Sequence, residues 1–485
     1  GTFSNTGTIQ GGITNSAQVD AEGFIDGAMV NQTGGTFTVT GALVASDTFN
    51  NAGTLEVDGG DLTGITTLTN TGDVTIADGQ TLAAATINNN TGGSVSVGVG
   101  STLQGTGNTL NNNATLDVAT NGAVTDAGAI NNNATGVINF NGPGGSATLN
   151  AGGAGTGTIT NAGEINVVSG NVTVGNDNVT TSNLIDVAAG STMSGLATLE
   201  QTAGDIQGGG TIDVTGGFTQ SGGTTGGTVD INAATFAQSG GATIGAGTTV
   251  TSSGAQTLSG GTISGTLDGA GAVTVQTGTT TVDGSITSGS IDIASGTLDI
   301  SGSAAIGDVT AVNIGAAGTL TSTSDSEAVG LLSGDVGGTL DITGTEFTTN
   351  GATDSTYAGA LVGDGATVFA KSGAGKLTLS GDGSGFDGTA GVNGGELLLG
   401  AGSTLNAGAV GSLVGATLTS EGGVLTNADV GLIAEGTTNF NGSETVAYLT
   451  NNAFNGAGTG TINVNGAATV LTLAGGTFTS EHDGA

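Results

Sequence analysis

The sequence has no cysteine, no tryptophan and no arginine, and it contains one proline, Pro143, and one histidine, His482. Without cysteine the chain cannot form a disulfide framework, a thiolate zinc site or a thiol nucleophile. A Ser–His–Asp or Cys–His catalytic system needs a positioned imidazole. His482 lies in a polar stretch close to the last residue, where we expect it to be solvated. The sequence therefore predicts that the protein is not an enzyme and has no catalytic or cofactor-binding residues.

Positive charge is almost absent. The chain has 2 Lys+Arg residues against 39 Asp+Glu residues, and its formal net charge is −37. Such a chain cannot neutralise a phosphate backbone, which excludes nucleic acid as a partner. An anionic membrane surface would repel it for the same reason. No apolar run approaches about 18 residues, so we expect no membrane-spanning segment in this chain.

Few aliphatic residues and a high net charge are typical of disordered proteins. Two features of this sequence argue against disorder. Charged residues make up only 8% of the chain, and the apolar residues recur in a regular pattern. Collagen is excluded because the 99 glycines have no three-residue period and proline is nearly absent.

The regular pattern is an internal repeat of about twenty residues. In the N-terminal third, an apolar residue is followed closely by asparagine and then by small or polar residues. The leading residues are Phe49, Leu68, Ile87, Leu110 and Ile130, at spacings of 19, 19, 23 and 20. Further along, the same step separates Gln201, Gln220 and Gln238, at spacings of 19 and 18. A repeat of this length favours a solenoid over a sandwich or a barrel.

Each repeat contains a short strand that reads Gly-Thr, apolar, polar, apolar. Alternation places Leu55 and Val57 on one face of such a strand and Glu56 on the other. Glycine and asparagine between the strands supply turn residues, and a chain with so much glycine is a poor helix former. The sequence predicts an all-β fold, a single elongated parallel β-solenoid of about 20 residues per coil.

Stacked coils place equivalent residues about 4.8 Å apart. Asn88, Asn111 and Asn131 occupy matched positions, so we expect their amides to form a hydrogen-bonded ladder. The length then corresponds to about 25 coils and a rod of roughly 120 Å. Composition divides this rod into residues 1–195 with the asparagine ladder, residues 196–355 rich in glycine, threonine and serine, and C-terminal residues 356–485.

Residues 371–400 read KSGAGKLTLSGDGSGFDGTAGVNGGELLLG. This segment resembles the passenger-associated repeat of bacterial autotransporters, which use type V secretion. The matching parts are the Lys371–Gly375 start, the Leu377–Gly381 strand, the Phe386–Gly388 turn, the Val392–Gly395 turn and the Leu397–Leu399 strand. Phe386 stands where the family usually has tyrosine. The other coils resemble filamentous-haemagglutinin-like adhesins in composition and period.

The resemblance implies a right-handed parallel β-helix on the surface of a Gram-negative cell, or secreted from it. It also implies that the C-terminal coils form the stable seed from which the rod folds. The family carries a C-terminal membrane β-barrel, and residues 401–485 lack its pattern of roughly ten-residue strands with aromatic girdles. We therefore expect that anchor to be absent from this sequence.

Calcium is the one metal that the sequence suggests, because it takes carboxylate and carbonyl oxygens. Asp364, Asp382 and Asp387 lie in glycine-rich turns and are the candidate ligands. The acids within the repeated strands are expected to face solvent; they are Glu56, Asp213, Asp230, Asp299 and Asp341. The only basic side chains are those of Lys371 and Lys376. They are interpreted either as part of the repeat, paired with Asp364 or Asp382, or as a recognition spot.

A threonine-rich run at 279–281 suggests an ice-binding face, but a regular Thr-x-Thr in successive coils is not evident in the sequence. The preferred hypothesis is a secreted or cell-surface structural adhesin, a rigid repetitive rod that acts in cell adhesion or biofilm. Its partners would be glycans, surface proteins or identical rods, bound through many weak contacts. The alternatives are a self-assembling extracellular filament or matrix protein and, third, a polysaccharide-cleaving β-helix enzyme with paired carboxylates.

Overall fold

The computed structural model describes residues 1–126, 128–153, 155–301, 305–425, 431–434, 436–451, 460–465 and 470–480. In this part of the chain 61% of residues are in strands and there is no helix. The strands form a parallel β-solenoid of about 22 turns with roughly 20 residues per turn, which confirms the predicted fold class. The number of turns falls below the expected 25 because some coils carry insertions. The longest step of the asparagine ladder, from Asn132 to Asn161, is 29 residues.

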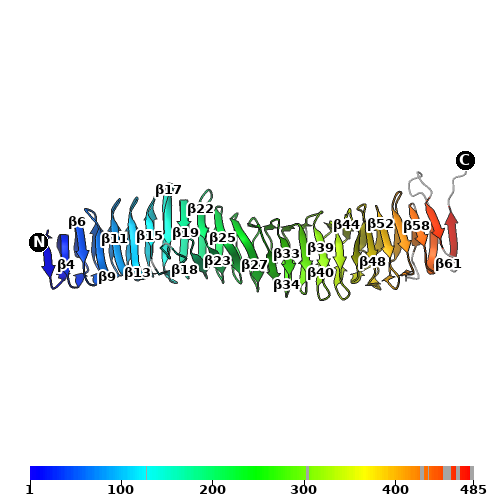
Figure 1. The fold of residues 1–485 in the computed structure, drawn as a ribbon, viewed down its shortest axis with the longest axis horizontal. Helices are drawn as coiled ribbons and strands as arrows, with labels where there is room; N and C mark the ends of the chain where they lie inside the picture. Colours follow the sequence, from blue (N-terminus) through cyan, green and yellow to red (C-terminus); the bar gives the residue numbers. More distant parts are fainter. Residues whose placement is uncertain are drawn as a thin grey trace. The chain divides into compact units, whose positions relative to one another are not determined.

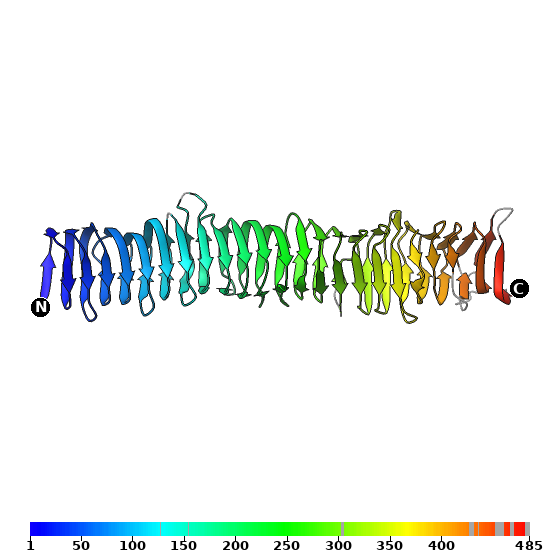
Figure 2. The same ribbon diagram turned by 90° about the horizontal axis from the view of Figure 1, so that it is seen from below.

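The solenoid divides into two compact units. Unit 1 comprises Gly1–Ala237 with Gly241–Thr251, and unit 2 comprises Gln238–Gly240 with Ser252–Ala485. Within each unit the coils lie directly on one another, as successive strands in Figures 1 and 2 show. The boundary between the units falls inside the predicted middle segment, 196–355. The predicted division into three segments is a statement about composition and stays a prediction.

A coil of unit 1 has three sides. The long strand β11 (Thr81–Asn89) pairs in parallel with β9 (Leu62–Asn70) and β13 (Thr102–Asn112). Its register shifts between Ala84 and Thr86, so the strand turns a corner there and supplies two sides. The short strand β12 (Ser94–Val97) supplies the third side and lies between β10 (Asp73–Ile76) and β14 (Thr115–Ala119).

The core is the column of inward side chains inside the coils. Leu82, Ile87, Val95 and Val97 are all buried in one coil, and the alternation predicted for Leu55, Glu56 and Val57 is confirmed. Aromatic rings contact one another in the core, edge to face for Phe37 and Phe49. Phe37 and Phe49 have ring centroids 5.2 Å apart, and those of Phe218 and Phe236 are 5.4 Å apart. Burial of apolar area, at roughly 25 cal/mol per Å², is the main force that holds each coil to the next.

A ladder of buried amides runs through unit 1 at the end of the second side. Each asparagine donates an Nδ2–H to Oδ1 of the next at 2.8–2.9 Å, in the order Asn15, Asn31, Asn51, Asn70, Asn89, Asn112, Asn132 and Asn161. The same Nδ2 also donates to a backbone carbonyl of the next coil, as from Asn51 to Asp73 O at 3.0 Å. Asn161 donates to the Thr181 hydroxyl at 3.1 Å. In the following coils Gln201 and Gln220 occupy the equivalent buried positions, and Gln220 donates to Gln201. These buried polar groups are therefore satisfied, as burial requires.

The ladder predicted at Asn88, Asn111 and Asn131 also exists. Asn131 donates to Asn111, and Asn111 donates to Asn88, both at 2.9 Å. These side chains are half-buried and lie one residue before the buried ladder. The prediction was confirmed for the outer ladder, whereas the inner and longer ladder was not singled out in the sequence.

Unit 2 contains an eight-stranded parallel sheet that includes β41 (Ser326–Val329), β44 (Glu346–Thr349), β47 (Val368–Lys371), β51 (Thr389–Val392) and β54 (Ala409–Ser412). The segment 371–400 continues from the end of β47 into β48 (Lys376–Leu379), β50 (Gly385–Phe386), β51 and β52 (Glu396–Leu399). The strands that the repeat pattern predicts are therefore present.

The aromatic residue of this segment packs on a glycine of the preceding coil. A Cβ on Gly363 would lie 2.8 Å from the Phe386 ring, so no other residue fits there. Tyr357 repeats the arrangement one coil earlier, where a Cβ on Gly334 would lie 2.8 Å from its ring. The Tyr357 hydroxyl donates to Ala360 O at 2.7 Å.

Candidate functional site

The second side of unit 1 presents a regular array of uncharged polar side chains. It is built by six successive strands: β9, β11, β13, β16 (Ala129–Asn132), β18 (Thr158–Asn161) and β20 (Asn178–Thr181). Each strand turns two residues outward, one on either side of a buried aliphatic residue. The first column is Thr67, Thr86, Thr109, Ala129, Thr158 and Asn178, and the second is Thr69, Asn88, Asn111, Asn131, Thr160 and Thr180. We call these two columns the uncharged face.

Every residue of the uncharged face is half-buried or exposed. The strands beneath it are fixed on their inner side by aliphatic packing and by the buried amide ladder. On the outer side, hydrogen bonds link neighbouring residues; in the second column these are the Asn88, Asn111 and Asn131 bonds. Apart from the methyl group of Ala129, the face is therefore a preorganised set of hydroxyl and carboxamide groups, each of which can donate and accept.

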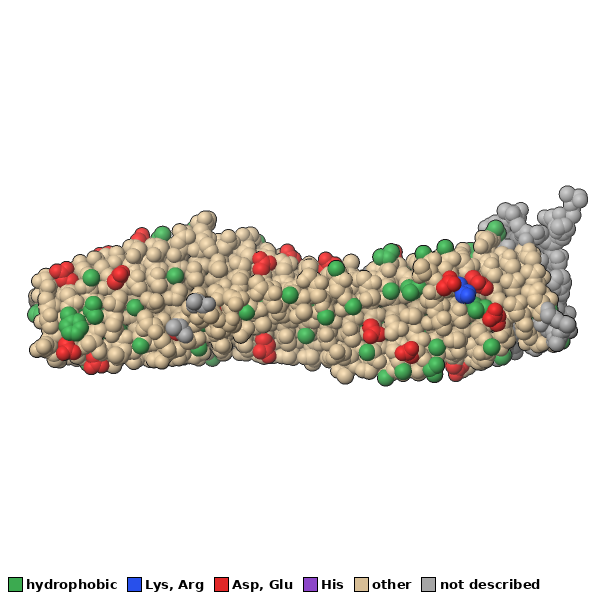
Figure 3. Space-filling model, viewed as in Figure 1, with side chains coloured by type: hydrophobic (Ala, Val, Ile, Leu, Met, Phe, Trp, Pro, Cys, Tyr) green, Lys and Arg blue, Asp and Glu red, His purple; other side chains and the backbone are tan. Residues whose placement is uncertain are grey.

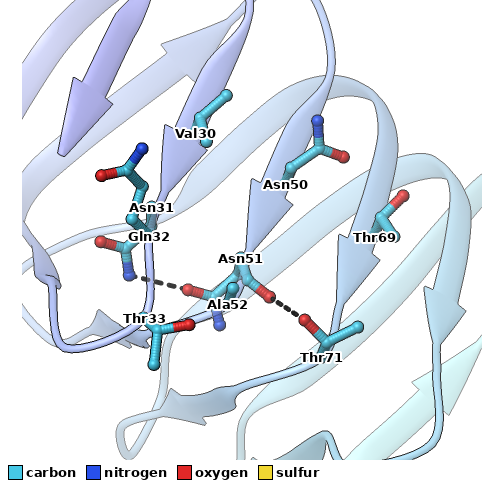
Figure 4. Close-up of a pocket in the computed structure, with 9 residues that line it drawn as sticks. All are labelled: Val30, Asn31, Gln32, Thr33, Asn50, Asn51, Ala52, Thr69 and Thr71. Carbon is cyan, nitrogen blue, oxygen red and sulfur yellow. Dashed lines mark hydrogen bonds between the residues drawn. The ribbon is translucent and has the colours of Figure 1, made fainter. Parts of the chain in front are cut away.

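A shallow groove of about 620 Å³ adjoins the uncharged face at its N-terminal side. Val30 of β5 (Met29–Asn31), Asn50 of β7 (Phe49–Asn51) and Thr69 of β9 lie on successive strands in its wall, as Figure 4 shows. Gln32, Thr33, Ala52 and Thr71 line the turn beyond these strands. No charged side chain lines this groove, so the surface is suited to hydroxyl-rich ligands rather than to ions.

The third side of unit 1 carries most of its strand carboxylates. These belong to the column of short strands and lie at Asp20, Glu56, Asp73, Asp117, Glu164, Asp186 and Asp205. Glu200 lies on the second side instead, on β23 (Thr198–Gln201), in register with Thr180. Several accept a hydrogen bond from a neutral side chain of an adjacent coil. The Ser94 hydroxyl donates to Asp73 and the Asn139 amide donates to Asp117, at 2.7 and 2.8 Å.

The carboxylates in this column are separated from one another by neutral residues. Thr38 lies between Asp20 and Glu56, and Asn139 follows Asp117. Unit 2 uses the same device, since Thr321 separates Asp299 from Asp341. Because like charges directly opposite destabilise a sheet, this spacing lowers the repulsion that stacked acids would otherwise create. Asp341 still has a raised pKa, which partial burial causes.

The outward placement predicted for the strand acids is confirmed. Glu56, Asp213, Asp299 and Asp341 are half-buried on the outer side of their strands, and Asp230 is exposed.

The two lysines have different environments. Lys371 is only 1% exposed, and its Nζ donates to the carbonyls of Gly373 and, at 3.3 Å, Gly394. Burial lowers its pKa, and the charge of Asp354 partly opposes that effect. The nearby acid is thus Asp354 rather than Asp364 or Asp382, because Lys371 points into the coil. Its burial leaves Lys376, which is half-buried, as the only lysine available for recognition. Figure 3 shows one basic side chain at the surface among acidic ones.

The three calcium candidates lie in exposed turns of unit 2. Asp364 and Asp387 occupy matched positions of adjacent coils, because Gly363 pairs with Phe386. Asp364 accepts from Ala366 N at 2.9 Å. Asp382 accepts from the Thr404 hydroxyl at 2.6 Å and from Ser384 N at 2.9 Å, which lowers its pKa. In the described part of the chain, no three Asp, Glu or His residues cluster as a metal site would require. The calcium site stays a prediction.

Sequence reasoning missed three buried carboxylates. Asp126 is 2% exposed and accepts from Gly128 N at 2.8 Å. Asp177 is fully buried, and its two oxygens accept from Ala151 N at 2.5 Å and Gly157 N at 2.7 Å. It thereby holds the ends of the insertion between β17 (Val137–Asn150) and β18. Glu327 on β41 is 2% exposed and accepts from Ile306 N at 2.8 Å. Glu327 alternates with Val329 on the inner face of β41, a position where the sequence favours an apolar residue, and Asp177 lies outside any strand.

Among the residues described, none belongs to a helix that is long and apolar enough to cross a bilayer. His482 lies outside the described residues.

No protein-family model, curated protein or solved structure matches this sequence. The solenoid is compatible with the passenger of an autotransporter or with a repeat adhesin, and the family resemblance of residues 371–400 stays a hypothesis.

Proposed function

We propose that this chain is a structural adhesin, a stiff repetitive solenoid that acts in adhesion or biofilm at the surface of a Gram-negative cell or after secretion. The observation that carries the proposal is the buried amide ladder. Eight asparagines in successive coils, each with two hydrogen-bonded neighbours or more, resist any change in the spacing of the coils. A fold of this kind suits a mechanical role, in which the protein presents the same surface many times.

The surface chemistry supports the same proposal. Hydroxyl and amide groups recur from coil to coil on the uncharged face and in the adjoining groove. A single coil offers only a few weak hydrogen bonds to a glycan or to a surface protein. Repetition raises the effective concentration of the second contact once the first is made, so avidity can exceed the affinity of one coil by a factor of about 10² to 10⁴.

The test uses the full 485-residue chain immobilised on fluorescent beads. We expect the beads to be retained on bacterial cells or on surfaces coated with extracellular glycans, and excess soluble chain to release them. Beads coated with an acidic globular protein of similar net charge control for charge. Retention equal to that control on every surface would refute the adhesin function.

Localisation needs a separate measurement. An antiserum against the chain should label intact producing cells, or the culture medium, as strongly as permeabilised cells. Labelling only after permeabilisation would contradict the proposed location. Electron microscopy of the purified chain distinguishes the alternative function, since fibres that grow with concentration would favour a self-assembling filament over an adhesin.

A further inference from the structure

The uncharged face is a two-dimensional lattice, and its dimensions follow from β-sheet geometry. Neighbouring parallel strands lie about 4.8 Å apart, and alternate residues along a strand lie about 6.6 Å apart. Thr69, Asn88 and Asn111 mark the first direction, in register across β9, β11 and β13. Thr158 and Thr160 mark the second on β18.

Tetrahedral hydrogen bonding in water gives a lattice of similar size. With an O···O distance of about 2.75 Å, second-neighbour oxygens in ice lie about 4.5 Å apart, and the repeat along the hexagonal axis is about 7.3 Å. The spacings of the uncharged face agree with these two repeats to within about a tenth. The difference is about 0.3 Å per rung, which side-chain rotation can absorb between neighbouring rungs, but it accumulates to about 1.5 Å across six strands. The match therefore holds over a few rungs at a time.

The composition of the face fits the same ligand. Hydroxyl and carboxamide groups donate and accept hydrogen bonds as water does, and an ordered water layer on them costs little entropy per molecule. Carboxylates orient a tightly bound hydration shell of their own, and most strand carboxylates of unit 1 lie on the third side instead. Glu200, in register with Thr180 on the next strand, marks the end of the face. The face also has no aromatic ring on which a sugar could stack.

The face is held rigid from below. Asn70, Asn89 and Asn112 of the buried ladder directly follow Thr69, Asn88 and Asn111 in their strands. The coil spacing under the lattice is therefore fixed by hydrogen bonds of 2.8–2.9 Å, and a crystalline ligand does not have to order the surface that it meets.

We propose that the uncharged face of β9 to β20 binds the surface of ice through a lattice of ordered water. This is a binding activity beyond the proposed adhesin function, and its test does not depend on that function. A regular Thr-x-Thr array is lacking, as expected from the sequence, because of the six strands only β9 and β18 carry threonine in both columns. The strand register nevertheless aligns threonine with asparagine from coil to coil.

The experiment measures how much of the full-length chain, labelled with a fluorophore, enters a slowly growing ice hemisphere. Wild type should be enriched in the ice, and it should also suppress recrystallisation in an annealed ice film. N111D places a charge in the middle of the second column, and T109Y places a bulky side chain in the first. Both variants should fall to the level of an inert protein that ice excludes.

Matched controls carry the same changes on the third side. T36D and T115Y alter outward residues of β6 (Thr36–Ala45) and β14, and both should enter ice as wild type does. Thr36 is suitable because its cross-strand partners, Gln18 and Thr54, are neutral. Circular dichroism of all variants checks that the coils still form. Exclusion of the wild type from ice, or equal loss in T36D and N111D, would overturn the proposal. Binding of wild type to insoluble neutral polysaccharide without entry into ice would assign the face to a polysaccharide and overturn it equally.

Discussion

Glu327 makes unit 2 sensitive to pH in the neutral range. Its side chain is 2% exposed and lies in the core column, in register with Phe347, whose ring stacks on that of Phe369 with centroids 6.5 Å apart. One carboxylate oxygen accepts from Ile306 N, and Oε2 has no hydrogen-bond partner among the residues that the structure describes. Burial raises the pKa of Glu327 to about 7, the Asp308 charge adds to this, and the Ile306 bond opposes it.

The change in the free energy of unfolding with pH follows from the shift in the pKa of Glu327. The unfolded chain releases this proton near pH 4.5 and the folded chain near pH 7, so between these values the native state binds the extra proton. The stability that Glu327 contributes is fully present below pH 4.5 and declines as the pH rises through 7. With about 1.4 kcal/mol per pH unit, the loss is about 3 kcal/mol.

The perturbation is Glu327→Gln, which removes the titration and keeps an acceptor for Ile306 N. Stacked repeats need not unfold in one step, so the readout is the local opening free energy from hydrogen–deuterium exchange in peptides that cover β41 and β44. We expect the difference between E327Q and wild type to change by about 3 kcal/mol in favour of E327Q between pH 4.5 and pH 8. Glu346→Gln, on the next strand of the sheet, is the matched control because Glu346 is half-buried. A difference for E327Q that does not vary with pH would refute the reasoning.

Three further predictions concern stability. Asn70→Ala breaks the buried ladder on both sides and should cost about 2–4 kcal/mol in urea unfolding, against less than about 1 kcal/mol for Asn88→Ala on the outer ladder; equal losses would contradict the ranking. Asp177→Ala leaves two buried backbone amides without an acceptor and should cost about 2–5 kcal/mol, with increased proteolysis at the insertion before β18 as an independent sign. Tyr357→Phe loses only the bond to Ala360 O and should cost about 1–2 kcal/mol with an unchanged circular dichroism spectrum, whereas a change of fold would show that the hydroxyl does more.

The repeat gave the correct fold class because every coil follows the same local rules. Leu55, Glu56 and Val57 alternate in the sequence, and burial in the structure follows that alternation. The outer amide ladder was also predictable, since Asn88, Asn111 and Asn131 follow an apolar residue in the same way. The repeat at 371–400 predicted the Phe386 turn, but not its counterpart at Tyr357.

The candidate sites were less predictable. The sequence suggests that Lys371 is a surface cation, yet its Nζ donates hydrogen bonds to two backbone carbonyls inside a coil. Glu327 lies on β41, where burial alternates, so it shares the inner face with Val329 although it is an acid. Asp177 lies just before β20, outside any strand, where alternation does not apply.

The sequence by itself determined that the chain forms parallel coils, which side chains enter the core, and that amides form ladders, because these depend on neighbours within a few residues. Only the tertiary structure decided which outward residues meet across coils. The steps between equivalent asparagines vary from 16 to 29 residues, and the extra residues leave the coil as insertions at its corners. Hydrogen bonding between strands restores the register after each insertion. It thereby aligns threonine and asparagine into one uncharged face and keeps most strand carboxylates of unit 1 on another.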